Sequence, residues 1–236
     1  MRLDKFFSSQ GILSRKDTKS AIKLGDIKVN GIIPKTSDEK IDEIKDEVCY
    51  KGKRIVFEEF VYIMLNKPQG VVSATNDNLH KCVLDLIPPS LKRDDLFPAG
   101  RLDKDTVGFV LITNDGDFAH NILSPKKHIS KTYEALVDSP IKQEHINIFA
   151  NGITLLSGEE CKPAQLRMLE NYGDTSLVEI VLVEGKYHQI KRMFASIGMN
   201  VLALKRTKMG QLQLDINLKD GECREILHKE LEEILL

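Results

Sequence analysis

Apolar residues gather in short runs along the chain, separated by charged and turn-forming stretches. Where they are consecutive or alternate with polar residues, they predict strands at Val61–Leu65, Phe109–Thr113, Tyr133–Val137, Ser176–Val183, Val201–Leu204 and Gln211–Leu214. Where they recur at the helical period, they predict helices at Ile141–Phe149, His188–Ile197 and Glu225–Leu236. Strands do not alternate regularly with long helices, so the pattern favours an α+β fold with a mixed or antiparallel sheet over a doubly wound α/β fold.

The N-terminal part of the chain predicts two short helices. The first covers Arg2–Gln10, and Ser14 can cap a second helix that runs to about Leu24, where Gly25 ends it. One face of this second helix carries basic residues at i, i+3, i+7 spacing, namely Lys16, Lys19 and Lys23.

A hairpin and a domain boundary are predicted after these helices. Ile27–Val29 and Ile32–Ile33 flank Asn30-Gly31, the strongest short signal for a β-hairpin. A charge-rich connection follows, so we expect the boundary between residues 46 and 59. The expected domains are residues 1–50 and residues 60–236.

Composition narrows the class of protein. Hydrophobic residues make up 42% of the chain and charged residues 29%, as in ordinary globular proteins. No apolar run approaches the roughly 18 residues of a membrane-spanning helix, and the N-terminus lacks the apolar segment of a signal peptide. We therefore expect a cytoplasmic protein without membrane contact. The four cysteines have no metal-ligand spacing, which argues against a disulfide framework or a structural zinc site.

The net charge of −1 hides two basic segments. Residues 1–35 contain eight Lys and Arg against three Asp, and residues 186–210 contain six Lys and Arg and no acid. Residues 211–236 carry three basic and seven acidic residues. Two basic segments in a nearly neutral chain are typical of a surface that binds a polyanion, although solvated helix faces would have the same composition.

The helix predicted over His188–Ile197 provides candidate catalytic groups. Its apolar stripe consists of Ile190, Met193, Phe194 and Ile197, and a second stripe consists of His188, Lys191, Arg192 and Ala195. A cation that is partly buried on such a helix needs a carboxylate partner. Asp103 and Asp105, in a polar segment between Gly100 and Gly108, are candidates, and a simple surface turn is the alternative for that segment.

Tyr133 begins a predicted strand and offers an aromatic face on which a nucleobase could stack, although core packing is the commoner role of such a residue. The chain has no glycine-rich phosphate loop, Ser/His/Asp set or metal-binding motif. We therefore expect chemistry that uses neither a bound metal nor a small-molecule cofactor.

Several segments, in this order, resemble the RsuA-type pseudouridine synthases, and the resemblance covers almost the whole chain. Residues 1–45 resemble an S4 RNA-binding domain through Arg2–Lys5, Ser14-Arg15 and Val29–Gly31. The region from residue 61 onward resembles the catalytic domain through Asn66–Ser73, Gly100–Asp103 with Gly108, Lys131–Tyr133 and Glu184–Met193.

The resemblance implies an activity and a set of site residues. A uridine in ribosomal RNA would be isomerised to pseudouridine, with Asp103 as the essential aspartate, Tyr133 as the ring that stacks on the uracil, and Lys191 as the basic partner of Asp103. Arg101 would enter the space that the flipped base leaves, and Asp105 would have a supporting role. The expected RNA contacts are Arg15, Lys16, Lys19, Lys23, Lys67, Arg101 and Arg192.

Within the family, Lys131–Tyr133, Lys162–Ala164 and His188–Ala195 are closer to the small-subunit enzyme than to its large-subunit relatives. The implied target is uridine 516 of 16S rRNA in an assembly intermediate, and we expect a monomer. Two alternatives stay open, a synthase for a 23S rRNA site and a non-catalytic S4-type rRNA-binding protein. Replacing Asp103 by Asn separates the second alternative from an enzyme, because a binder would keep its function.

Overall fold

The computed structural model describes residues 1–124 and 127–236, and the contacts within it divide the chain into two compact units. The first unit contains Met1–Val61 together with Ile87–Leu96, and the second contains Tyr62–Leu86 and Phe97–Leu236. Ile87–Leu96 falls within the predicted second domain, yet it belongs to the first unit by its contacts. A local sequence pattern does not show that a later segment returns to an earlier part of the chain.

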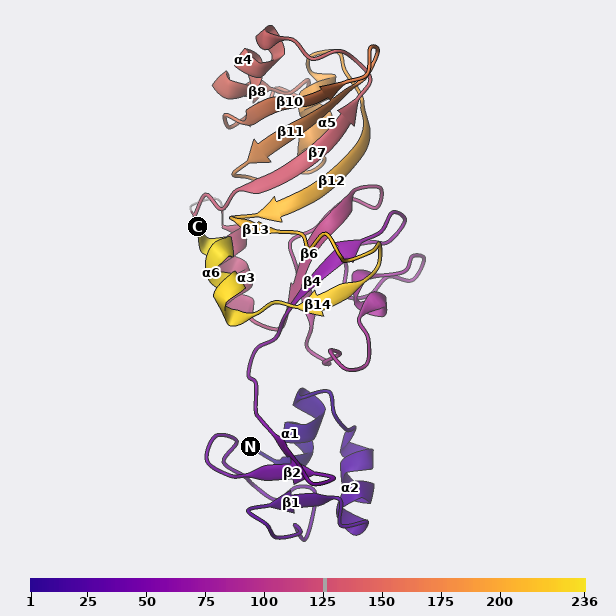
Figure 1. Ribbon diagram of the computed structural model, residues 1–236, viewed down its shortest axis with the longest axis vertical. Coiled ribbons are helices and arrows are strands. Elements are labelled where there is room, and N and C mark those ends of the chain that lie inside the picture. The colour runs from indigo at the N-terminus through magenta and orange to yellow at the C-terminus, as the bar shows by residue number, and fades with distance from the viewer. Residues whose placement is uncertain (125–126) are drawn as a thin grey trace. The chain divides into compact units, whose positions relative to one another are not determined.

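Two helices and a three-stranded antiparallel sheet make up the first unit (Figure 1). Its elements are α1 (Leu3–Ser9), α2 (Arg15–Lys23), β1 (Ile27–Val29), β2 (Val48–Tyr50) and β3 (Lys53–Ile55). The Ser14 hydroxyl accepts a hydrogen bond from the backbone N–H of Asp17, so the predicted cap of α2 is confirmed. The centre of the core consists of Leu3, Phe6, Phe7, Ile27 and Val48.

The turn predicted at Asn30-Gly31 is confirmed, but the hairpin that it closes is only one residue pair long. Both residues have a positive φ, as a tight turn requires, but the turn is followed by a single bridge between Val29 and Ile32. β1 pairs with β2, which lies in the segment predicted as a polar connection. Val48 of β2 is buried in the core whereas Ile32 is 73% exposed, so burial of apolar side chains favours the longer ladder on the β2 side of β1.

A mixed sheet forms the second unit and confirms the predicted α+β fold class. The strand order is β10-β11-β7-β12-β6-β4-β14, in which only β6 and β12 are parallel neighbours, and β5 and β13 pair with β6 and β12. The strands are β4 (Tyr62–Lys67), β5 (Phe97–Ala99), β6 (Val107–Thr113), β7 (Lys131–Val137), β10 (Gln165–Asn171), β11 (Ser176–Leu182), β12 (Val201–Met209), β13 (Leu212–Gln213) and β14 (Cys223–Glu225). A separate pair consists of β8 (Ile153–Thr154) and β9 (Glu160–Cys161).

The interior strands of this sheet are the ones that the sequence predicts. The runs around Val61, Phe109, Tyr133 and Ser176 become β4, β6, β7 and β11, whose core-facing residues are buried. β10 and β14 escape prediction because they lie at the two ends of the strand order. Most of their residues are exposed or half-buried, so they lack the apolar pattern of an interior strand.

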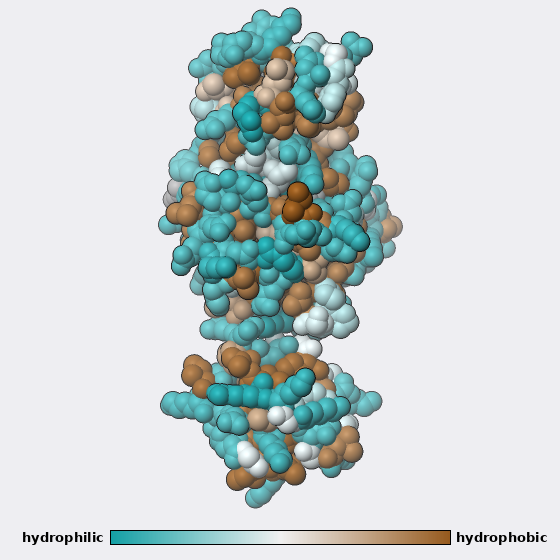
Figure 2. All heavy atoms as spheres, viewed as in Figure 1, coloured by the Kyte–Doolittle hydropathy of each residue, from teal (hydrophilic) through white to brown (hydrophobic). Residues whose placement is uncertain are grey.

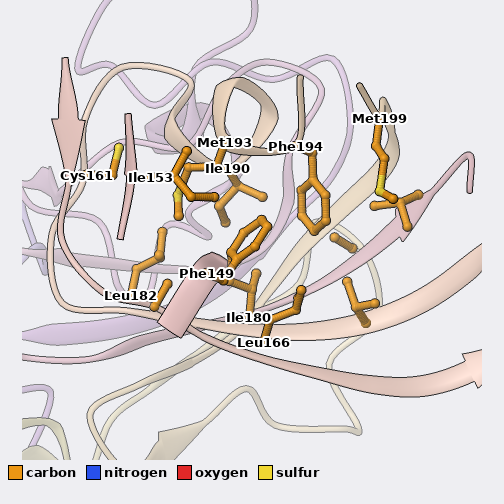
Figure 3. Close-up of a cluster of buried hydrophobic side chains, with 14 of the residues drawn as sticks. Phe149, Ile153, Cys161, Leu166, Ile180, Leu182, Ile190, Met193, Phe194 and Met199 are labelled. Carbon is orange, nitrogen blue, oxygen red and sulfur yellow. The ribbon is translucent and has the colours of Figure 1, made fainter. Parts of the chain in front are cut away.

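Helices pack against both halves of the sheet. α4 (Gln143–Asn151) and α5 (Gln189–Ala195) place Phe149 and Phe194 over β11, where Ile180 lies beneath them (Figure 3). α3 (Gly116–Leu123) and α6 (His228–Leu235) contribute side chains to one core with β4 and β6. α3 begins directly after Asp115, because the Asp115 side chain accepts a hydrogen bond from the N–H of Phe118 and caps the helix.

Hydrophilic side chains cover most of the face shown in Figure 2, with apolar side chains interspersed. Within residues 1–124 and 127–236, no helix has the length and apolar character needed to cross a membrane.

Gly108 allows β6 to begin directly beside β12. Val107 and Gly108 pair in parallel with Lys205 and Arg206, and a Cβ atom at position 108 would lie 2.3 Å from the carbonyl oxygen of Arg206. The φ angle of Gly108 is +98°, which also favours glycine. This close approach fixes one end of the loop between β5 and β6.

Candidate active site

Asp103 lies in the loop between β5 and β6 and lines a small pocket of the second unit. The Asp103 side chain is 27% exposed, so solvent and a ligand can both reach it. The pocket is lined by Arg101, Leu102, Asp103, Thr106, Tyr133, Leu182, Glu184, Gly185, Lys186, His188, Gln189, Ile190, Lys191 and Leu204. The fold thus brings together three segments that are far apart in the sequence, around residues 103, 133 and 188.

The two oxygens of the Asp103 carboxylate face different nitrogen atoms. Oδ1 lies 3.5 Å from Nε2 of His188, and Oδ2 lies 3.4 Å from Nζ of Lys191. The predicted ion pair between Asp103 and Lys191, in a pocket that also contains Tyr133, is therefore confirmed. The Asp103 carboxylate thus lies between His188 and Lys191, two groups that can each stabilise negative charge.

Lys191 is shared between two carboxylates. Its Nζ lies 2.6 Å from Oδ1 of Asp105, closer than it lies to Asp103. The hydrogen bond from Lys191 holds the pKa of the Asp105 carboxyl below its usual value. Asp105 is more exposed than Asp103 and is absent from the pocket lining, so it braces Lys191 from outside.

α5 directs Lys191 toward the loop because the other side of the helix is buried. Ile190, Met193 and Phe194 extend into the core between helix and sheet, which confirms the predicted apolar stripe (Figure 3). Gln189 secures the segment before the helix, since its side chain accepts a hydrogen bond from the N–H of Lys186 and donates one to Glu184.

Ser73 fixes the backbone next to Asp103. Its hydroxyl donates a hydrogen bond to the carbonyl oxygen of Leu102 over 3.1 Å and accepts one from the N–H of the same residue over 3.0 Å. Both bonds are buried, so water does not compete for these groups. The segment around Ser73 therefore fixes the position of the loop that carries Asp103.

Lys67 does not occupy the RNA-contacting position that the sequence analysis gives it. The side chain is fully buried, and its Nζ donates hydrogen bonds to the carbonyl oxygens of Pro68, Lys104 and Thr106. Burial lowers the pKa of Lys67 to about 8, and the nearby Asp105 and Asp103 only partly oppose this effect. Lys67 thus holds the loop over residues 104–106 from within, and a phosphate has no access to its ammonium group.

Tyr133 occupies the position in β7 that pairs with Ile180 and Arg206. The residue is half-buried, packs against the core of the second unit, and lines the pocket. Packing and a place in the pocket are therefore combined in one residue. The neighbouring β7 residues Thr132 and Glu134 line a different, larger hollow, whose lining in the described part of the chain contains none of the predicted site residues.

The remaining predicted residues of the second unit divide into two groups. Arg101 is exposed and lines the pocket. Arg192 is absent from that lining and bonds to Ser157 and Glu159 at 2.8 and 2.9 Å. The guanidinium of Arg192 thus supports the turn between β8 and β9.

In the first unit, the basic residues Arg15, Lys16, Lys19 and Lys23 are exposed on α2. Lys19 and Lys23 line a hollow together with Arg2 and Lys35. This cluster of cations can bind phosphate groups.

His188 and Ser73 are the site residues that the sequence analysis does not select. His188 shares the helical stripe of Lys191, so its i, i+3 spacing is the signal that could have found it. Ser73 gives no such signal, because its partner Leu102 is distant in the sequence. Among the described residues, no group of three or more His, Cys, Asp and Glu side chains is arranged to hold a metal ion.

Comparison with known proteins gives one consistent family. The family model for RNA pseudouridylate synthases matches residues 61–196. A Bacillus subtilis protein named as an uncharacterized RNA pseudouridine synthase, YtzG, is 44% identical over 231 residues, which cover 98% of this chain and 97% of the relative.

Relatives named ribosomal small subunit pseudouridine synthase A are 39% identical over 238 residues in Haemophilus influenzae and 37% identical over 239 residues in Escherichia coli. Each match covers 100% of both chains. A solved crystal structure described as a pseudouridylate synthase is 38% identical, covers 99% of each chain, and superposes with a TM-score of 0.68.

Proposed function

This chain belongs to the RNA pseudouridylate synthase family and is a pseudouridine synthase, and we propose that its substrate is uridine 516 of 16S ribosomal RNA. The pocket that joins the Asp103 carboxylate, the Lys191 ammonium and the Tyr133 ring carries the proposal for the site. The full-length similarity to small-subunit enzymes supports the choice of RNA.

The reaction is an isomerisation that changes one bond of the nucleotide. The bond between C1′ and N1 breaks, the uracil turns, and a bond between C1′ and C5 forms. The C5 hydrogen leaves as a proton and N1 gains one, so no electrons are exchanged with another molecule. An enzyme for this reaction must hold the detached uracil and stabilise charge at the sugar and the base.

The described residues supply these functions. Asp103 is the catalytic residue that assists cleavage of the bond between C1′ and N1, and the ion pair with Lys191 orients its carboxylate. Tyr133 stacks on the uracil and retains it while it turns. Arg101, exposed beside the pocket, takes the place of the extruded base. A stacked uridine must leave the RNA helix to reach Asp103, at a cost of a few kcal/mol.

The cations of the first unit recruit the RNA. Arg15, Lys16, Lys19 and Lys23 form the RNA-binding face of an S4-like domain at residues 1–50, and residues 60–236 form the catalytic domain. Phosphate contacts supply affinity without reading sequence, so they suit a module that holds a large RNA.

The deciding experiment is pseudouridine mapping of 16S and 23S rRNA from cells with and without the gene. We expect the modification at uridine 516 to be lost with the gene and restored by the wild-type protein. Asp103→Asn should bind the RNA and restore nothing. Asp117→Asn is a matched control, because Asp117 is exposed on α3 and does not line the pocket.

An unchanged pattern in both RNAs would contradict a ribosomal substrate. Loss of a 23S modification with uridine 516 intact would move the target to the large subunit. Full restoration by Asp103→Asn would refute the assignment of the catalytic residue.

A further inference from the structure

Two aromatic rings lie stacked in the connection between β11 and α5, next to the pocket that contains Asp103. The rings of Tyr187 and His188 are 3.8 Å apart between centroids, and their planes are inclined by 19°. His188 lines the pocket, and Tyr187 is 72% exposed. The tyrosine therefore contributes little to the core and presents most of its surface to solvent.

The position of this stack is fixed relative to the catalytic carboxylate. Nε2 of His188 lies 3.5 Å from Oδ1 of Asp103, and the backbone carbonyl of Tyr187 accepts a hydrogen bond from Arg192 over 3.2 Å. The His188 backbone has a φ of +50°, in the left-handed region that side chains other than glycine rarely adopt. The surrounding contacts thus hold an unusual conformation that displays both rings.

The pocket already contains an aromatic residue for the uracil, so a second aromatic surface outside it has a different role. Tyr133 is half-buried and lines the pocket, whereas Tyr187 lies on the outer side of His188 and is absent from that lining. Extrusion of a uridine leaves the adjacent nucleobase without its stacking partner. An exposed aromatic ring can replace that partner, whatever the base, because every nucleobase has a π-face.

Charge near the stack also favours RNA. Arg101 is exposed and lines the same pocket as His188, and Lys186 and Lys191 line it too. A nucleobase brought to Tyr187 carries its phosphate toward these cations of the pocket. An apolar peptide partner would gain nothing from these cations.

We propose that the Tyr187–His188 stack is a subsite for the nucleobase that flanks the target uridine. The proposal rests on the pseudouridine synthase function above and adds to it a second RNA-contacting surface. Tyr187 supplies the stacking face, and His188 positions Tyr187 beside Asp103. The subsite holds the RNA in the opened state in which the uridine lies in the pocket.

The test compares tyrosine variants on a labelled RNA. The probe is an oligoribonucleotide with the 16S sequence around uridine 516 and 2-aminopurine on one or the other side of that uridine. Tyr187→Ala removes the ring, and Tyr187→Phe keeps the ring without its hydroxyl. Tyr172→Ala is the control, because Tyr172 is also exposed, at 57%, but lies in the turn between β10 and β11 and bonds to Glu170.

We expect wild-type protein to quench one of the two 2-aminopurines, and Tyr187→Ala to abolish this quenching. On full-length 16S rRNA, kcat/KM of Tyr187→Ala should fall by about 5- to 150-fold, the range of one lost base-aromatic stack. The kcat/KM values of Tyr187→Phe and Tyr172→Ala should both remain within about twofold of the wild type, because both variants keep an aromatic ring at position 187.

Equal quenching and equal kcat/KM for Tyr187→Ala and wild type would overturn the subsite. A loss in Tyr187→Phe as large as in Tyr187→Ala would assign the effect to the hydroxyl and overturn stacking. If mapping places the target at another uridine, the proposed substrate is wrong. The same variants are then tested on an oligoribonucleotide with 2-aminopurine beside the mapped uridine, and equal quenching by Tyr187→Ala and wild type overturns the subsite. If no uridine is modified, unchanged affinity of Tyr187→Ala for the oligoribonucleotide overturns it.

Discussion

The Nζ atom of Lys191 lies 2.6 Å from Oδ1 of Asp105, so the nearest carboxylate to this lysine is the one outside the pocket. Lys191 approaches Asp103 from this braced position at 3.4 Å. A second anchor limits the motion of a long side chain, and Asp105 therefore contributes to the geometry of the site without lining it.

This arrangement predicts unequal effects of substitutions at Asp105 and Lys191. Asp105→Asn should lower single-turnover pseudouridine formation by less than about tenfold, since Lys191 can still pair with Asp103. Lys191→Gln should lower it by more than about 100-fold, because the charge opposite Asp103 is lost. Comparable losses in the two variants would contradict the outer role of Asp105. Lys191→Arg is the control for charge, and it should recover part of the rate.

Ser73→Ala should impair catalysis more than RNA binding. The substitution leaves the buried N–H and carbonyl of Leu102 without the Ser73 hydroxyl, at a stability cost of about 1–3 kcal/mol. Because the adjacent Asp103 is then less firmly placed, we expect kcat to fall about tenfold with KM nearly unchanged. Ser73→Thr should restore kcat. Ser130→Ala, a half-buried serine outside the pocket, should change neither constant, and a rise in KM alone in Ser73→Ala would argue against positioning.

Lys67 should make folding stability depend on pH above neutrality. Its pKa is about 8 in the folded protein and near 10.5 in the unfolded chain, so between these values the unfolded chain binds more protons. The free energy of unfolding therefore rises with pH across this window. Below pH 8 the buried Lys67 is charged in the folded protein, and its burial destabilises the fold.

Urea unfolding of wild type and Lys67→Met between pH 7 and 10 tests this linkage. The wild type should gain about 2 kcal/mol relative to the variant over that range. The buried Lys131, whose pKa burial also lowers to about 8, is present in both proteins and cancels in the difference. A difference that does not change with pH would show that Lys67 titrates normally.

Gly108→Ala should be far more damaging than an alanine at a glycine of similar φ. The new Cβ would lie 2.3 Å from the carbonyl oxygen of Arg206, so β6 and β12 would have to separate. We expect a loss of more than about 3 kcal/mol in the free energy of unfolding, or no folded protein. Gly173→Ala has a φ of +85° and no neighbouring atom within 4 Å, so it should lose only about 1 kcal/mol. Equal urea midpoints for the two variants would refute the steric argument.

Local pattern alone determined much of the fold. The apolar runs around Phe109 and Tyr133 predict interior strands. The first strand is buried on both faces and the second mainly on one. Ser14 begins α2 because its hydroxyl bonds to a backbone N–H three residues away. The two stripes of the α5 segment likewise follow from the helical period, and they place Lys191 opposite the core.

Only the tertiary structure decided which long-range partners these elements have. The sequence predicts Lys67 as an RNA contact, because a lysine shows the same local pattern whether its ammonium faces phosphate or three backbone carbonyls. β1 forms a three-residue ladder with β2, whose Val48 reaches the core, and only one bridge with the exposed Ile32. The sequence offers Asp103 and Asp105 as candidates. The contacts of Asp103 with His188 and Lys191 arise only when the loop between β5 and β6 meets the beginning of α5 in the folded domain. Contacts between distant segments depend on the burial of both partners at once, and this is a property that the order of residues in either segment does not contain.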